Sequence, residues 1–362
     1  MNLLYEEVEE ELRSAVRALL SARAGWPSVL ARTESGEPYD MGLWPALAGE
    51  LGCGGLLIPE ELGGAGASLR EAAVVAEETG RACAPVPFLG GAVATVLLLA
   101  CRSAQVDAQV DDVLAGLAAG SVTAAVAVPF STPPGSGFVS TVRVAGDLLS
   151  GRVTSVADAL PADVLLVPAA DGVYLVDAGA AVREAVVSLD MTRRLCDIEF
   201  PAVPARRIGD GQGLDWALSC GAALLASEQL GLAERCLELT VEYVNSRHQF
   251  GRPVGSYQGL KHRLAELWVA ITQARAVARY AAACAASGDA DTGVAVAVAQ
   301  AHCGPVAVRA AEECVQMHGG IGFTWEHPAH LYLKRAKSAA LAYGTTSRHR
   351  ATLGELVGLP GR

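Results

Sequence analysis

The sequence lacks both a hydrophobic run long enough to cross a membrane and a basic leader at its N-terminus. No uninterrupted apolar run in the 362 residues reaches about 18 positions, and residues 1–7 (MNLLYEE) are acidic. A secretory signal peptide instead begins with positive charges followed by an apolar stretch. We therefore expect no signal peptide, no membrane anchor and a cytoplasmic location.

Excess positive charge and closely spaced cysteine pairs are also missing. The formal net charge is -11 and the pI is near 5.2, which argues against a nucleic acid or another polyanion wrapping the surface. Nine cysteines occur, an odd number without any C-x-x-C pair, and most lie in apolar helical text. This pattern favours reduced thiols in the core over disulfides or a zinc site.

What the sequence does contain is enough apolar residues for more than one core. Hydrophobic residues make up 51% and charged residues 19% of a chain whose length suits two or three domains. Residues 1–120 read as helical, with Ser68 as N-cap of one helix and a glycine loop at 59–66. Residues 121–210 carry short valine-rich runs that predict a small antiparallel sheet or barrel, and residues 211–362 return to the helical period.

The fold class that we predict is α+β, mainly α, with an N-terminal helical domain (1–120), a middle β domain (121–210) and a C-terminal four-helix bundle (211–362). The predicted strands are 122–128, 139–144, 164–167, 173–176 and 186–189. The predicted helices include 5–22, 44–51 and 68–81, followed by 214–247, 258–286, 290–318 and 330–342.

Two glycine-containing motifs interrupt the C-terminal helices. The first runs from Arg247 to Gln258 (RHQFGRPVGSYQ) and offers a cation, the aromatic Phe250 and an amide at the ends of two helices, a combination suited to a phosphorylated ligand. The alternative reading is a helix-helix turn with an exposed arginine. The second motif, residues 316–323 (QMHGGIGF), has three glycines in four positions, which suggests backbone that a ligand approaches closely.

Taken together, these motifs resemble those of the acyl-CoA dehydrogenase family. The pattern R-x-x-F-G-x-P-x-x-x-Y-Q-x-x-x-H at 247–262, the pattern Q-x-H-G-G-x-G-F at 316–323 and the loop PEELGGAG at 59–66 all match, in the family's domain order. The resemblance implies a flavoprotein that holds FAD and oxidises an acyl-CoA between its α and β carbons. A glutamate removes the α proton, and electrons pass to an electron-transferring flavoprotein.

The resemblance also implies which residues hold the cofactor. Arg247, Phe250 and Gln258 match positions that reach across a subunit interface to a neighbour's FAD. Gln316, Gly319 and Gly320 match the segment that contacts the same cofactor's adenosine and pyrophosphate half. Gly344 and Thr345 match a Gly-Thr pair that lies along the cofactor.

The residues expected around the flavin ring and the base depart from the family pattern. Phe130-Ser131-Thr132 stands where the family has Thr-Glu-Pro, and residues 151–157 (GRVTSVA) lack the tryptophan that covers the ring. The base expected before Gly344 is replaced by Tyr343, and the alternative base position falls at Gly221. Neither residue can act as a carboxylate base.

The first acid that follows position 221 on the predicted helix 214–247 is Glu228, displaced from position 221 by about 10 Å. An ion pair at a helix packing surface is the reading that we prefer for Glu228. His318, His327 and His330 lie close together in the sequence, but we expect no metal there.

Three functional hypotheses follow. In the first, the chain is the non-catalytic, FAD-clasping subunit of a hetero-oligomer, a heterotetramer with a homologous dehydrogenase acting on steroid side-chain or fatty acyl-CoA. In the second, it is a self-sufficient homo-oligomeric dehydrogenase with Glu228 as a displaced base. In the third, it is a flavin-free scaffold that binds an acyl-CoA or a partner protein.

Overall fold

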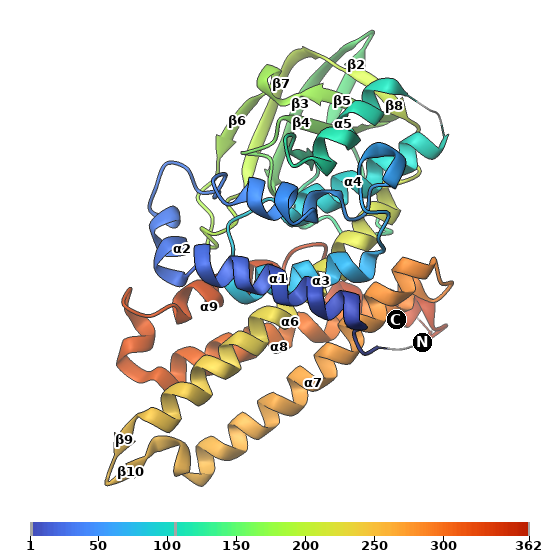
Figure 1. Cartoon of the computed structure of the whole chain (residues 1–362). Helices are drawn as coiled ribbons and strands as arrows, with labels where there is room; N and C mark the ends of the chain where they lie inside the picture. Colours follow the sequence, from blue (N-terminus) through green and yellow to red (C-terminus); the bar gives the residue numbers. More distant parts are fainter. Residues whose placement is uncertain (1–2, 105–106, 361–362) are drawn as a thin grey trace.

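The computed structural model describes residues 3–104 and 107–360, arranged as a β region above a layer of N-terminal helices and a long C-terminal bundle (Figure 1). The N-terminal helices therefore lie between the sheets and the bundle. The helices are α1 (Glu7–Arg23), α2 (Trp26–Thr33), α3 (Leu69–Ala82), α4 (Phe88–Ala104), α5 (Ala108–Ala118), α6 (Leu214–Ser246), α7 (Gln258–Ser287), α8 (Thr292–His318), α9 (Ala329–Ala339) and α10 (Thr346–Leu356).

Local sequence signals explain where the N-terminal helices begin and which face they bury. In α1, Val16 and Leu20 lie on one buried stripe at helical spacing. Ser68 caps α3 as predicted, because its hydroxyl accepts a hydrogen bond from the Arg70 amide and Glu71 completes a capping box. The helix predicted at 44–51 is instead a short π-helical turn, Pro45–Glu50.

The middle region contains two small sheets. Among the described residues, one sheet has the order β1-β4-β5-β8, the other has the order β2-β3-β7-β6, and a two-stranded hairpin, β9-β10, joins α6 to α7. The strands are β1 (Ala124–Val126), β2 (Val142–Ala145), β3 (Leu148–Val156), β4 (Val164–Ala169), β5 (Gly172–Asp177), β6 (Val182–Ala185), β7 (Cys196–Pro204), β8 (Arg206–Gly209), β9 (His248–Gln249) and β10 (Arg252–Pro253).

Two expectations about these strands are wrong. The valine-rich segment 186–189 is not a strand, since β6 ends before it and Val187 is fully exposed. The sheets are not purely antiparallel, because β1 and β4 pair in parallel.

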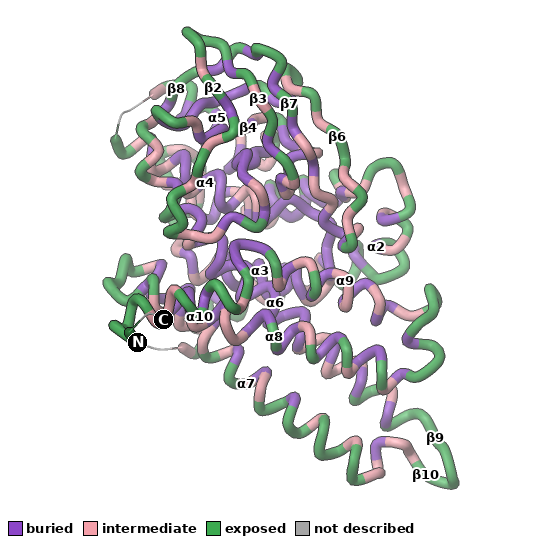
Figure 2. The backbone as a smooth tube through the Cα atoms, turned by 180° about the vertical axis from the view of Figure 1, so that it is seen from behind, coloured by how far each residue is buried: buried purple, intermediate pink, exposed green. Residues whose placement is uncertain are grey.

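The bundle is centred on α6, which packs against α3, α7 and α8. The α3 and α6 helices cross closely because each places a glycine against the backbone of the other. A Cβ on Gly231 would lie 1.8 Å from the Glu77 carbonyl oxygen, and one on Gly80 would lie 2.1 Å from the Glu228 carbonyl oxygen. Buried residues follow α6 and α8, whereas much of α7 is exposed (Figure 2).

The interior is apolar and its thiols are unpaired. All nine cysteines lie in the described part of the chain, and each is free and buried, as predicted. The segment Thr292–Phe323 is apolar and long enough to span a membrane by length and composition, but 61% of its most apolar window is buried in this fold. It comprises α8 and the turn that follows it, and α8 packs against α6 and α7 in the bundle.

Candidate functional site

The two positions that could carry a base meet at one point in the fold. Tyr343 follows α9 and Gly221 lies in the second turn of α6, 122 positions earlier in the sequence. A Cβ on Gly221 would lie 3.0 Å from the Tyr343 hydroxyl oxygen and 2.7 Å from the Val93 Cγ2 atom. The Tyr343 ring therefore fills the space that a longer side chain at position 221 would need.

Tyr343 is held in this position by its backbone and by an aromatic neighbour. Its amide donates a hydrogen bond of 2.8 Å to the Phe130 carbonyl, and its φ of 50° is a left-handed conformation that is uncommon for a bulky residue. The Phe130 ring meets the Tyr343 ring edge to face at 5.4 Å. Burial raises the pKa of the Tyr343 hydroxyl well above its ordinary value, so this group stays protonated at neutral pH.

The space next to these two rings is small. The cavity that Phe130 and Tyr343 line has a volume of about 20 Å³, and Ala157 and Asp158 complete its wall from the sheet side. Such a volume holds about one water molecule. Phe130 and Ala157 lie where the sequence predicted a departure from the ring-contacting pattern, and the cavity that they line is too small for a flavin ring.

Asp158 is a carboxylate in that wall which no sequence pattern indicated. Its two oxygens accept hydrogen bonds from the Tyr39 hydroxyl at 2.9 Å and from the Gly90 amide at 2.8 Å. The Arg193 Nε atom lies 3.9 Å away. The carboxylate thus joins the sheet region to the N-terminal helices. Contacts between residues so far apart in the chain leave no local signal in the sequence.

Glu228 lies deep in the interior between two arginines. Its oxygens accept hydrogen bonds from Arg193 at 2.5 and 3.1 Å and from Arg335 Nε at 2.9 Å. Burial alone would raise the pKa of Glu228, but the two guanidinium groups outweigh burial and lower the pKa to about 2. A carboxylate held this strongly in its charged form is a poor proton acceptor.

The predicted clasp residues on the first motif are exposed at the far end of α6. Arg247 is the C-cap of α6, Gln258 is the first residue of α7, and both side chains are exposed. Phe250, at the tip of the β9-β10 hairpin, is 93% exposed with a φ of 53°. These are side chains presented outward, away from their own core.

The second motif lies beside that end of α6. The ring of His318, the last residue of α8, stacks on Tyr243 of α6 with centroids 4.4 Å apart, and Tyr243 is one turn before Arg247. Gln316, Gly319 and Gly320 are therefore brought to the same end of the bundle as Arg247. We call Arg247, Phe250, Gln258, Gln316, Gly319 and Gly320 the distal clasp.

The three glycines of the second motif do different things. Gly319 has a φ of 61° and ends α8, and Gly320 has open space where a side chain would be. Gly322 instead packs against its own chain, since a Cβ there would lie 2.5 Å from the Val315 carbonyl oxygen. Only part of the glycine pattern is thus available to a ligand.

The distal clasp cannot reach the cavity at Tyr343. Gly221 and Arg247 are 26 residues apart on one helix, which corresponds to about 39 Å at 1.5 Å per residue. The structure therefore separates the predicted cofactor residues into the distal clasp and a second group next to Tyr343.

That second group is Gly344, which is buried by the chain itself, and Thr345, whose side chain is exposed. A Cβ on Gly344 would lie 2.9 Å from the Pro133 Cβ atom, and the Thr345 hydroxyl accepts a hydrogen bond from the Arg348 amide as N-cap of α10. The loop that carries Pro133 is tied to α6 by a hydrogen bond from the Gly135 amide to Asp215. Backbone that could have faced a cofactor faces this loop.

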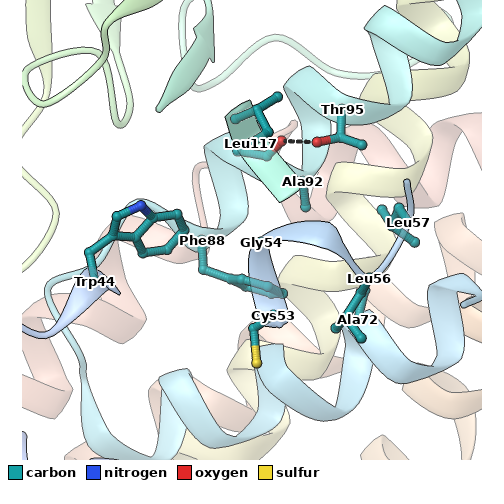
Figure 3. Close-up of a pocket in the computed structure, with 11 residues that line it drawn as sticks. Trp44, Cys53, Gly54, Leu56, Leu57, Ala72, Phe88, Ala92, Thr95 and Leu117 are labelled. Atoms are coloured by element: carbon teal, nitrogen blue, oxygen red, sulfur yellow. Dashed lines mark hydrogen bonds between the residues drawn. The ribbon is translucent and has the colours of Figure 1, made fainter. Parts of the chain in front are cut away.

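A second small cavity lies among the N-terminal helices (Figure 3). It has a volume of about 20 Å³ and is lined mainly by apolar side chains, including Trp44 and Phe88. The Thr95 hydroxyl in its wall donates to the Gly91 carbonyl. This cavity is likewise too small for a flavin ring.

The histidines that lie close together in the sequence pack against one another and against other rings. In the described ranges, no group of three or more His, Cys, Asp or Glu residues is placed to hold a metal ion. His318 instead stacks on His327 at 4.0 Å, and His330 meets Trp325 edge to face at 4.6 Å.

Comparisons with known proteins match this chain over most of its length. Residues 6–121 match the family described as acyl-CoA dehydrogenase, N-terminal domain, and residues 211–358 match acyl-CoA dehydrogenase, C-terminal domain. The sequence is 40% identical over 338 residues to acyl-CoA dehydrogenase IpdE2 of Mycobacterium tuberculosis, covering 92% of each chain. It is 37% identical to IpdE2 of Mycolicibacterium smegmatis, covering 93% of this chain and 95% of that protein.

Solved structures of two-component proteins are similar as well. A variant of the steroid acyl-CoA dehydrogenase Tcur3481-Tcur3483 aligns with a TM-score of 0.86 and 31% identity over 97% of this chain and 98% of that one. The ChsE4-ChsE5 complex from Mycobacterium tuberculosis aligns with a TM-score of 0.88 and 25% identity over 100% of both chains.

Proposed function

The chain belongs to the acyl-CoA dehydrogenase family, whose members are FAD-dependent oxidoreductases, and from that premise we propose that it completes the FAD site of a homologous partner subunit without supplying a base itself. The partner contributes the catalytic glutamate and the wall that covers the flavin ring. The assembly is then a hetero-oligomer that dehydrogenates an acyl-CoA thioester.

The observation that carries this proposal is the separation of the two groups of cofactor residues. Tyr343, which directly precedes Gly344 and Thr345, lines a cavity of about 20 Å³ together with Phe130, while the distal clasp is exposed about 39 Å away along α6. The local cavity does not fit a flavin. The distal clasp does fit one end of FAD, because it offers a guanidinium for phosphate, an amide, an aromatic ring and open backbone at Gly320.

Within the assembly, the clasp residues bind and orient, and they take no part in proton transfer. Arg247 would hold the pyrophosphate charge, Phe250 would stack on a flat part of the cofactor and Gln258 would accept or donate a hydrogen bond. FAD, when bound, supplies the hydride acceptor of the reaction. The proton acceptor must come from the partner, since the positions of Tyr343 and Gly221 contain no carboxylate.

Exposed apolar side chains support association. Trp268 and Val269 on the outer face of α7 are 59% and 49% exposed, and Phe323 and Trp325 are exposed next to the distal clasp. In the proposed assembly these exposed apolar side chains would lie at contacts between subunits. We further propose a steroid-derived acyl-CoA as substrate and an electron-transferring flavoprotein as acceptor, in line with the similar steroid acyl-CoA dehydrogenase and the family's chemistry.

The competing hypothesis of a displaced base finds little support. Glu228 is engaged by Arg193 and Arg335, and its low pKa opposes proton abstraction. A flavin-free scaffold is a distinct outcome of the experiment below.

The test is to express the chain alone and together with a homologous dehydrogenase that carries the glutamate, and to measure retained FAD and acyl-CoA dehydrogenation. We expect FAD and turnover only in the complex, and loss of FAD from the complex with Arg247→Ala. The matched control is Arg348→Ala, which removes another exposed arginine on α10 and should leave FAD retention unchanged. Tight FAD and full turnover from the lone chain would contradict the proposal, and a colourless complex would favour the scaffold.

A further inference from the structure

Three aromatic rings pack against one another next to the distal clasp. Tyr243 comes from α6, His318 is the last residue of α8, and His327 lies just before α9. The Tyr243 and His318 centroids are 4.4 Å apart with planes at 30°, and the His318 and His327 centroids are 4.0 Å apart with planes at 37°. His318 is therefore the middle ring of a stack that joins three segments of the bundle.

The position of His318 in the chain connects this stack to both halves of the clasp. It lies between Gln316 and the pair Gly319-Gly320 in sequence. Its partner Tyr243 lies one helical turn before Arg247, and the Arg247 amide donates a hydrogen bond of 2.9 Å to the Tyr243 carbonyl. Any shift of the His318 ring relative to Tyr243 would change the separation between the two halves.

The His318 ring is fixed in one orientation. The side chain is buried, and its Nδ1 atom lies 2.6 Å from the Cys314 carbonyl oxygen. A carbonyl oxygen can only accept, so Nδ1 carries the proton. The hydrogen bond runs back along α8 and holds the ring plane against Tyr243.

Charge does not oppose the contact between the two imidazoles. Burial, together with the nearby His318 and His330, lowers the pKa of His327 to about 4. Burial alone would lower the pKa of His318 too, but its hydrogen bonds with Cys314 outweigh burial and raise it. At neutral pH, His327 is therefore uncharged and the stack carries at most one positive charge.

We propose that His318 is a positioning residue for the FAD clasp: its ring, held between Tyr243 and His327, sets the distance between Arg247 and the Gln316–Gly320 turn. The inference rests on the proposed function, because a clasp is only useful where the chain completes a partner's cofactor site. In this role His318 positions the clasp and neither reacts with substrate nor binds a metal.

The experiment measures the FAD dissociation constant of the purified complex, from flavin fluorescence, for variants of this chain. His318→Ala removes both ring contacts and should weaken FAD binding about tenfold, the loss expected when two aromatic contacts disappear. His318→Phe keeps a flat ring between Tyr243 and His327 but loses the hydrogen bond to Cys314, so it should bind FAD more tightly than the alanine variant. His318→Leu keeps apolar volume without a ring and should resemble the alanine variant.

Two controls separate positioning from general loss of stability and from failure of the proposed function. Val306→Ala creates a cavity in the same helix away from the clasp, and should lower the melting temperature without changing FAD affinity. Arg247→Ala tests the clasp directly. If Arg247→Ala weakens FAD binding but His318→Ala or His318→Leu does not, the positioning role is wrong and the proposed function stands. If Arg247→Ala has no effect, the proposed function fails and the inference fails with it.

Discussion

Tyr343 stands at the position where the family pattern has its catalytic carboxylate. Its ring occupies the space shared by both base positions, and Phe130 packs against it. Restoring a carboxylate at one position would leave the small cavity and its aromatic wall in place. The departure from the family's site pattern therefore involves several neighbouring residues and not Tyr343 alone.

Tyr343→Glu should accordingly fail to make the lone chain active. The new carboxyl group would be buried beside a cavity with no room for a flavin, in a wall that already holds the Asp158 carboxylate, so we expect no turnover and a less stable protein. Tyr343→Phe, which keeps the ring, is the matched control and should change stability little. Acyl-CoA dehydrogenation assays on the purified variants check this, and measurable turnover by the glutamate variant would count against a chain without its own active site.

Replacing Glu228 should lower the stability of the chain, whereas turnover by the complex should depend on the partner's glutamate. Glu228→Gln leaves Arg193 and Arg335 without their central anion, and breaking such a buried pair costs about 3–5 kcal/mol. Denaturant unfolding measures the change. Loss of turnover in the complex with unchanged stability would instead identify Glu228 as the base.

The same carboxylate predicts a direction for the pH dependence. Because its folded pKa is lowered to about 2 from an ordinary value of 4.5, its contribution to stability is present above about pH 4.5 and is lost as the pH falls toward 2. The Glu228→Gln variant should show a flatter stability curve across that window. An identical slope for both proteins would contradict the ion-pair interpretation.

At the scale of elements, two glycines on different helices have different roles: Gly231 allows close helix packing, and Gly320 is available to a ligand. Gly231 lies where α6 crosses α3, and a methyl group added to it would lie 1.8 Å from the Glu77 carbonyl oxygen, whereas Gly320 faces open space. Gly231→Ala should lower the melting temperature strongly. Gly320→Ala should leave it nearly unchanged but weaken FAD binding by the complex. Thermal unfolding and FAD titration of both variants decide this, and the reverse pattern would be inconsistent with the assigned roles.

The elements also show how far sequence reasoning reaches. Helical periodicity located α6, α7 and α8 closely, because each has a long buried stripe. The search for short valine-rich runs missed β3 and β7, whose irregular pairing hides the alternation of apolar residues. It also predicted a strand at 186–189, where Val187 is exposed. The motifs predicted the clasp residues, but no local signal indicated that Tyr343 fills the space beside Gly221, or that Asp158 ties Tyr39 to Gly90. Those contacts depend on tertiary packing.

At the scale of the whole molecule, α6 acts as a spacer. Its length places the distal clasp about 39 Å from the filled cavity, and in the proposed assembly the clasp therefore contacts a cofactor held by another subunit. The exposed face of α7 and the apolar residues near the clasp are then parts of a contact surface.

The most direct test of this shared-cofactor proposal is the amount of FAD bound by the purified complex of this chain with its homologous partner, measured from flavin absorbance against protein concentration. We predict one FAD for each pair of unlike subunits, and none retained by this chain alone. One FAD on every subunit, or a yellow and active lone chain, would contradict it.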